Sequence, residues 1–142
     1  MPNRKANATW EGSLQTGKGR MKLGSGAFDG PFAFQTRMGD EPGTNPEELI
    51  GAALAGCFSM ALSLGLGQAG APPQRIQTTA AVKLEKQGDG FAITHILLRT
   101  EAQVAGLDAA KFQEIAEQTK KGCPVSKALS AVKIDLEAKL LG

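Results

Sequence analysis

The sequence has 142 residues, of which 42% are hydrophobic, and its formal net charge is +2. This length fits one compact domain, so we expect a single domain over residues 1–142. The small net charge, without a basic patch interleaved with aromatic residues, argues against nucleic acid as a partner. The basic residues near the N-terminus have no apolar stretch behind them, so they do not form a secretory signal, and we expect a cytoplasmic protein.

The N-terminal third contains short alternating runs separated by glycines. These runs predict three strands, over residues 6–11, 18–23 and 32–38. The turns between and beside them are predicted at Gly12, Gly17, Gly24 and Gly30-Pro31.

A helix start follows, with Asn45 suited to the N-cap and Pro46 to the first helical position. From residue 49 to residue 74 the chain has no charged residue, so the helix over residues 49–67 is long enough to span a membrane. Gly, Ala and Ser dominate it, Glu47 and Glu48 flank one end, and no Trp or Tyr belt is present. We therefore expect a buried helix and no membrane partner.

Small residues recur every four positions along this helix, at Gly51 and Ala55, at Ala52 and Gly56, and at Ala55 and Ser59. Such spacing lets two helix backbones approach closely. One sheet face can cover only one side of an uncharged helix, so the other side needs a second partner. We expect that partner to be a copy of the same helix, in a homodimer with residues 49–67 at its centre.

The second half of the chain predicts a hairpin, two helices and a final strand. Strands over residues 78–86 and 91–103 flank Gly88-Asp89-Gly90. Asp108 caps a helix that ends near Gly122, a short helix begins at Pro124, and residues 132–140 alternate cleanly between apolar and charged. Strands and helices are segregated along the chain, so the fold class is α+β.

The two cysteines have opposite settings. Cys57 lies among apolar residues inside the long helix, where burial raises a thiol pKa, and alone it reads as structural. Cys123 stands at an N-cap position before Pro124, just after Lys120 and Lys121, which favours the thiolate. Local chemistry therefore favours Cys123 as the nucleophile. One histidine and two distant cysteines make a poor metal site.

Three runs resemble the signatures of the OsmC/Ohr family, the osmotically inducible protein C and organic hydroperoxide resistance proteins. They are residues 43–53, residues 55–61 around Cys57, and residues 122–126 around Cys123. The resemblance covers essentially the whole chain and is closest to the OsmC branch. It implies a cytosolic, cofactor-free, intertwined homodimer, with antiparallel sheets packed around long central helices.

The resemblance also implies a peroxidase that reduces organic hydroperoxides and, more weakly, hydrogen peroxide. By motif, Cys57 matches the peroxidatic cysteine, which becomes a sulfenate, and Cys123 matches the resolving cysteine of a Cys57–Cys123 disulfide. Arg37 matches the family's activating arginine and Glu47 its carboxylate partner. The implied reductant is a dithiol, with lipoylated proteins as the family's example.

The spacing of Glu47 and Cys57 adds a hypothesis about subunits. Ten residues of α-helix span about 15 Å, so both cannot meet one arginine head on the same straight helix. If two copies cross antiparallel near Ala52, Glu47 of one chain comes level with Cys57 of the other. We therefore expect active sites shared between subunits.

Two other interpretations remain open from the residues. The chain is alternatively a general thiol–disulfide oxidoreductase, although it lacks a C-x-x-C pair. It is alternatively a non-enzymatic dimerisation domain whose cysteines only pack. Glu48 is expected to act as a helix cap and His95 as a strand-surface or interface residue.

Overall fold

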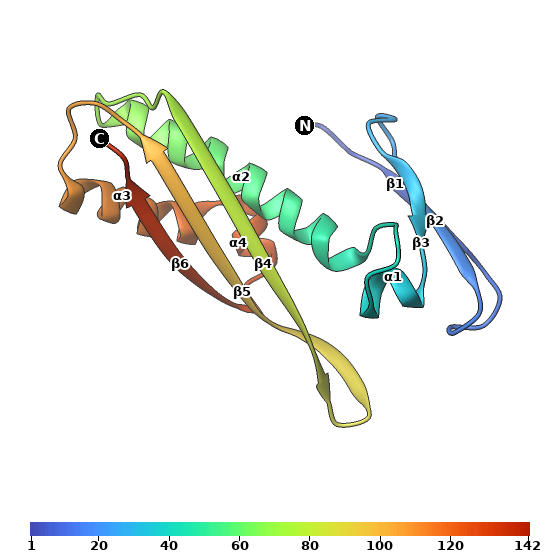
Figure 1. The fold of residues 1–142 in the computed structure, drawn as a ribbon. Helices are drawn as coiled ribbons and strands as arrows, with labels where there is room; N and C mark the ends of the chain where they lie inside the picture. The colour runs from blue at the N-terminus through green and yellow to red at the C-terminus, as the bar shows by residue number, and fades with distance from the viewer. The chain divides into compact units, whose positions relative to one another are not determined.

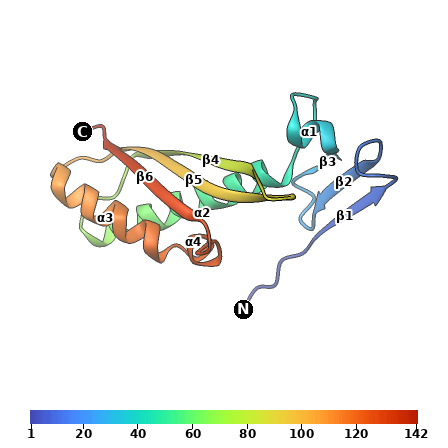
Figure 2. The same ribbon diagram turned by 90° about the horizontal axis from the view of Figure 1, so that it is seen from below.

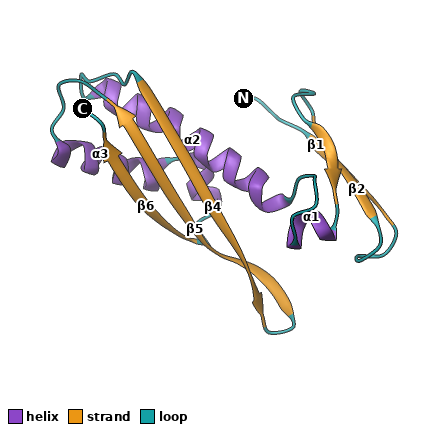
Figure 3. Cartoon of the chain, in the orientation of Figure 1, coloured by secondary structure: helices purple, strands orange, loops and turns teal.

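A computed structural model describes residues 1–142, and its helices and strands are segregated as the α+β class requires (Figure 3). Contacts within the chain form two compact units, Met1–Leu49 and Ile50–Gly142. The single domain over residues 1–142 stays a prediction, and the two units are described in turn.

The first unit is a small antiparallel sheet followed by one helical turn. Its strands are β1 (Ala6–Glu11), β2 (Lys18–Leu23) and β3 (Asp29–Phe32), in the order β1-β2-β3. The first two strands occupy the predicted ranges. Helix α1 (Phe34–Met38) comes next.

The predicted strand over residues 32–38, with a turn at Gly30-Pro31, is wrong. Gly30 and Pro31 lie inside β3, an edge strand, where a proline is tolerated although it lacks a backbone donor. The chain then coils into α1 because Thr36 Oγ1 accepts a hydrogen bond of 2.9 Å from the Ala33 N–H. Its hydroxyl also lies 2.6 Å from the Thr44 carbonyl, which it donates to.

Helix α2 (Pro46–Gln68) has 23 residues and runs from the first unit into the second. The predicted start is confirmed, because Asn45 Oδ1 accepts a 2.8 Å hydrogen bond from the Glu48 N–H. Pro46 fills the first helical position, where its missing donor costs nothing.

The second unit holds the larger sheet, with strands β4 (Arg75–Gln87), β5 (Gly90–Gln103) and β6 (Lys133–Leu140) in that order (Figure 1). The predicted hairpin is confirmed between β4 and β5, with Gly88 at φ 59° in the loop. Strand β6 pairs with β5 in parallel, so this sheet is mixed, whereas we expected antiparallel sheets. Helices α3 (Ala109–Gly122) and α4 (Pro124–Ala128) form the crossover that a parallel pair requires.

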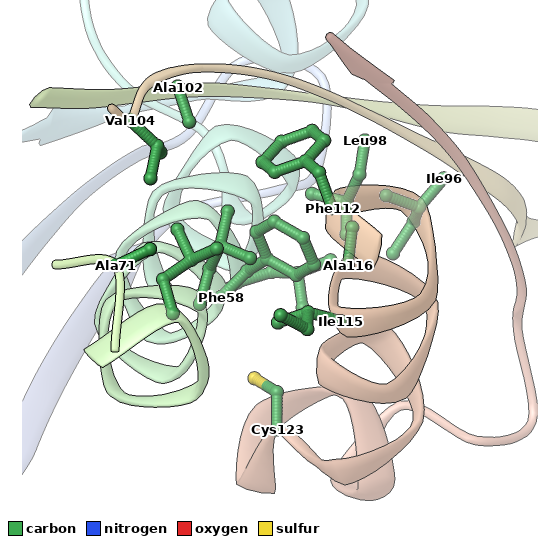
Figure 4. Packing of buried hydrophobic residues seen from close by; sticks show 13 residues of the cluster. Phe58, Ala71, Ile96, Leu98, Ala102, Val104, Phe112, Ile115, Ala116 and Cys123 are labelled. Atoms are coloured by element: carbon green, nitrogen blue, oxygen red, sulfur yellow. The ribbon is translucent and has the colours of Figure 1, made fainter. Parts of the chain in front are cut away.

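The core of the second unit lies between its sheet and its helices. In Figure 2, α2 and α3 cover the same face of this sheet. Figure 4 shows the side chains of Phe58 from α2 and Phe112 from α3 meeting in this layer, and both are fully buried. The inward residues of β5 complete the core, namely Ile96, Leu98 and Ala102.

Helix α2 buries only one of its faces within this chain. It is long and apolar enough to cross a membrane by length and composition, yet its large side chains are buried in the core (Leu54, Phe58, Leu62 and Leu66, each 0% exposed). The opposite face is open, with Met60 77% and Leu64 63% exposed. A single chain therefore covers one side of this helix, and the expected cover on the other side, a second copy of the helix, stays a prediction.

The small residues of α2 divide between these faces. A Cβ on Gly51 would lie 3.3 Å from the Ala80 carbonyl oxygen, so Gly51 packs against β4. Ser59 also faces β4, because its hydroxyl donates a 2.8 Å hydrogen bond to Thr78 Oγ1. Ala52 and Gly56 are exposed, so theirs is the one predicted pair that lies wholly on the open face.

Candidate functional site

Arg37 and Glu47 form a bidentate ion pair within the first unit. Arg37 Nη2 lies 2.6 Å from Glu47 Oε1, and Arg37 Nε lies 3.0 Å from Oε1 and 3.2 Å from Oε2. Glu47 is 7% exposed, and it reaches Arg37 because α1 and the first turn of α2 present the two side chains to each other. Arg37 lies on α1, which replaces the predicted strand. The geometry keeps one guanidinium charge in a fixed place.

Cys57 and Cys123 form the second feature, within the second unit. Their sulfur atoms are 2.7 Å apart, although 66 positions separate them in the sequence, and both cysteines are free. Helix α2 carries Cys57, and Cys123 stands between α3 and α4, where its N–H donates to the Thr119 carbonyl. The crossover to β6 thus brings two distant thiols into contact.

The two thiols differ in acidity. Burial raises the pKa of Cys57, and its hydrogen bond with Cys123 raises it further. Burial also raises the pKa of Cys123, but hydrogen bonds from Cys57 and from the N–H groups of Ser126 and Val125 bring it below its ordinary value. The raised pKa of Cys57 and the lowered pKa of Cys123 both agree with the directions expected from the sequence. Lys120 and Lys121, which we expected to lower the pKa of Cys123, do not contribute to it. No positive charge contributes to the pKa of Cys57.

Two residues that we assigned to structural roles each contact one neighbouring side chain, and Asn45 rather than the Glu48 carboxylate caps α2. The Glu48 carboxylate accepts a hydrogen bond of 2.7 Å from the Thr44 hydroxyl beside the start of α2. His95 Nε2 lies 2.6 Å from Asp135 Oδ2 on the half-exposed outer face of the larger sheet.

Ser126 lies in the run around Cys123, but the sequence alone did not single it out as a buried residue. It is 6% exposed, and its hydroxyl has no hydrogen-bond partner of regular geometry. Its signal in the sequence is its position three residues after Cys123, from which an N3 side chain reaches back to the N-cap residue.

A groove of about 600 Å³ lies between the second half of α2 and α3. Small and aliphatic residues dominate its lining, including Ala61, Gly65 and Ile115, and Cys123 borders it. The groove therefore places a largely apolar surface next to Cys123, with Gln68, Lys111 and Gln118 also in its lining, whereas Cys57 does not line it.

Comparison with known proteins shows what this chain resembles. A family model described as OsmC-like protein matches residues 39–137. Peroxiredoxin OsmC of Escherichia coli (strain K12) is 51% identical over 139 residues, which cover 96% of this chain and 97% of that protein. Organic hydroperoxide resistance protein-like 2 of Staphylococcus epidermidis is 33% identical, covering 85% of this chain and 88% of the relative.

Solved structures share the fold. The organic hydroperoxide resistance protein OhrB of Bacillus subtilis superimposes with a TM-score of 0.68 at 26% identity, covering 96% of this chain and 97% of that one. An OsmC-like protein of unknown function from Vibrio cholerae gives a TM-score of 0.76 at 15% identity, with 97% and 99% covered.

Proposed function

Because this chain belongs to the OsmC-like protein family, and is therefore a peroxide-related redox protein, we propose that it reduces organic hydroperoxides with Cys57 and Cys123. The observation that carries the proposal is the 2.7 Å separation of two sulfur atoms from distant parts of the chain. In this fold α2 is a core helix and not a membrane span. We propose the cytoplasm as its location, where a thiol pair stays reduced between turnovers.

The proposed reaction has two oxidative steps. The Cys57 thiolate attacks the terminal oxygen of the hydroperoxide, the O–O bond breaks, and Cys57 becomes a sulfenic acid. The departing alkoxide takes up the proton that the Cys57 thiol released on ionisation and leaves as the alcohol. The Cys123 thiolate then attacks the Cys57 sulfur, the S–O bond breaks, and the disulfide forms. The departing hydroxide takes up the proton that the Cys123 thiol released and leaves as water. Contact between the two thiols favours this condensation over further oxidation. The apolar groove beside Cys123 supports an organic peroxide, whose alkyl group needs such a surface.

Cys57 needs a cation that its own surroundings do not supply. Burial raises the pKa of Cys57, and no positive charge offsets that effect. The candidate is Arg37, whose head is held by Glu47 in the first turn of α2. Along one helix, Glu47 and Cys57 are separated by about 15 Å. We therefore assign the activating Arg37 and its Glu47 to the partner subunit of a homodimer.

The open face of α2 supports this dimer. Ala53, Met60 and Leu64 flank Cys57 at helical spacing, and all three are exposed. Cys57 thus stands at the edge of an apolar face that requires a cover in water. A second α2 crossing antiparallel over this face brings its own first turn level with Cys57.

Single-turnover peroxide consumption tests the roles of the two cysteines. Cys123→Ser should still consume one equivalent of cumene hydroperoxide per chain, whereas Cys57→Ser should consume none. Catalytic turnover with a dithiol should be lost in both variants. Consumption by Cys57→Ser and none by Cys123→Ser would reverse the roles. A protein that exchanges disulfides but leaves the peroxide intact would instead be a general thiol–disulfide oxidoreductase.

Mixed dimers test the shared site. Arg37→Ala and Cys57→Ser chains are each expected to be inactive alone, and co-refolding equal amounts should restore about a quarter of the wild-type activity, since half of the dimers are mixed and each holds one complete site. Arg99→Ala, which removes an arginine paired with Glu137 on the surface, is the matched control and should be active alone. Mixtures that regain no activity would place Arg37 and Cys57 of each site in one chain.

A further inference from the structure

Helix α1 depends on one buried residue for its place in the first unit. It has only five residues, and Thr36 is the only one of them that is buried. A helix of this length is not stable by itself in water, so tertiary contacts must hold it. Arg37, which is paired with Glu47, is the next residue in the same turn. Whatever fixes Thr36 therefore also fixes the backbone from which the guanidinium extends.

The Thr36 hydroxyl makes two hydrogen bonds that close this turn and anchor it. It donates to the Thr44 carbonyl oxygen at 2.6 Å, and it accepts the Ala33 N–H at 2.9 Å. The Ala33 carbonyl oxygen in turn accepts the Arg37 N–H at 3.1 Å. One hydroxyl thus closes the turn that carries Arg37 and ties it to the segment just before α2.

Thr44 is itself held in place, so it can serve as a fixed point. Its N–H donates to the Pro31 carbonyl oxygen at 2.9 Å, and it forms a parallel bridge with Phe32 at the end of β3. Thr44 therefore connects the edge of the small sheet with the first turn of α2, which carries Glu47. Through the Thr36 hydroxyl, α1 is joined to this connection and keeps a fixed distance from Glu47.

The methyl group of Thr36 packs on Gly43. A Cβ on Gly43 would lie only 2.7 Å from Thr36 Cγ2, and the φ of 146° at this position also favours glycine. Threonine thus contributes a hydroxyl to the anchor and a methyl group to the packing. Serine keeps the hydroxyl alone and valine keeps the methyl group alone, so two substitutions separate the contributions.

We propose that Thr36 is the positioning residue for Arg37, whose guanidinium it holds on Glu47 and presents to Cys57 of the partner subunit. The inference rests on the proposed function in one respect, because the presentation to Cys57 requires the shared site. The Arg37 side chain is 40% exposed, so water competes with Glu47 for the guanidinium once α1 is released. Thr36 itself touches none of the reacting atoms and acts only through Arg37.

Nuclear magnetic resonance of the Arg37 Nε–H group tests the positioning in the full-length protein. The signal is identified by its loss in Arg37→Ala, and in the wild type it should report a rigid group. In Thr36→Val its order parameter should fall into the flexible range, below about 0.6, whereas Thr36→Ser should keep the wild-type value. A rigid Arg37 in Thr36→Val would overturn the proposal. An equal loss in both variants would assign the anchor to the methyl group and would overturn it as well.

Alkylation of Cys57 tests whether this position matters to the thiol. In the Cys123→Ser background, Thr36→Val should raise the pH midpoint of alkylation by roughly one pH unit, because a cation is withdrawn from the thiolate. Thr36→Ser should keep the midpoint, and so should the matched control Thr9→Val, at an exposed threonine of β1. Combined with Arg37→Ala, Thr36→Val should add no further shift, since it acts through Arg37. An additive shift would contradict the proposal.

The outcomes separate this inference from the proposed function. A raised midpoint in Arg37→Ala without one in Thr36→Val would overturn the role of Thr36 and leave the proposed function intact. No shift in either variant would refute the assignment of Arg37 to Cys57, while the resonance measurement still decides whether Thr36 positions Arg37. Thermal unfolding is recorded for every variant. A lower melting temperature with a rigid Arg37 and an unshifted midpoint would show a purely structural role and overturn the proposal.

Discussion

Replacing Gly56 by alanine adds one methyl group to the open face of α2. In the single chain, a Cβ at this position has no atom within 4 Å. Alanine in place of glycine inside a helix contributes about 1 kcal/mol of stability. By this reasoning an isolated chain should become more stable.

The proposed dimer predicts the opposite effect on association. If the partner α2 packs closely against Ala52 and Gly56, each added methyl group overpacks the contact by about 1–3 kcal/mol. Two such groups occur in a symmetric dimer, so the dissociation constant should rise roughly 30-fold even at the lower limit. The helix-propensity gain is common to both states and does not offset this change.

Sedimentation velocity over a dilution series measures the association, and urea unfolding at two protein concentrations measures the stability linked to it. Gly51→Ala is the matched control on the sheet side, where the new Cβ would lie 3.3 Å from the Ala80 carbonyl oxygen and 3.4 Å from Val82 Cγ2. That variant should leave the dissociation constant unchanged. If Gly56→Ala also dimerises with wild-type affinity, the close crossing of two α2 helices at this position is wrong.

Three further predictions concern the second unit. Thr78→Val removes the acceptor of the Ser59 hydroxyl and should lower the free energy of unfolding by about 1–3 kcal/mol, measured in urea. Phe58→Ala empties a fully buried position and should cost about 3–5 kcal/mol by the same assay. The His95 hydrogen bond holds the pKa of Asp135 below its usual value, so its ionised form stabilises the fold above the unfolded pKa. That contribution is lost as pH falls through the lowered pKa, and the stability difference from Asp135→Asn should vanish in acid.

Local signals predicted most of the elements. The cap at Asn45 and the glycine-containing turn at Gly88 need only neighbouring residues, and both are confirmed. The run over residues 32–38 failed because its alternating apolar residues suit a strand, whereas a hydrogen bond from Thr36 to the more distant Thr44 selects a helical turn. The alternation of apolar and charged residues in β6 predicted which residues lie on each face of the strand. It carries no information on direction, so it could not predict that β6 pairs with β5 in parallel.

The sequence and the resemblance nominated the residues of the candidate site, but they did not give its geometry. The resemblance supplied Arg37 and Glu47, and the structure shows that they form an ion pair. Cys57 and Cys123 come into contact because α3 and α4 cross from β5 to β6. The number of residues between the two cysteines does not predict that path. Ser126 was inconspicuous because serine suits a first helical turn, and only its burial without a partner distinguishes it.

The parallel pairing of β5 with β6 also determines when the thiols meet. Strand β6 occupies Lys133–Leu140, so the sheet that anchors the crossover is complete only once β6 has been synthesised. Cys57 leaves the ribosome 66 residues before Cys123. Contacts of such long sequence separation form slowly, because loop closure precedes them. The nascent chain therefore carries Cys57 as a solitary thiol while the 66 positions up to Cys123 are added.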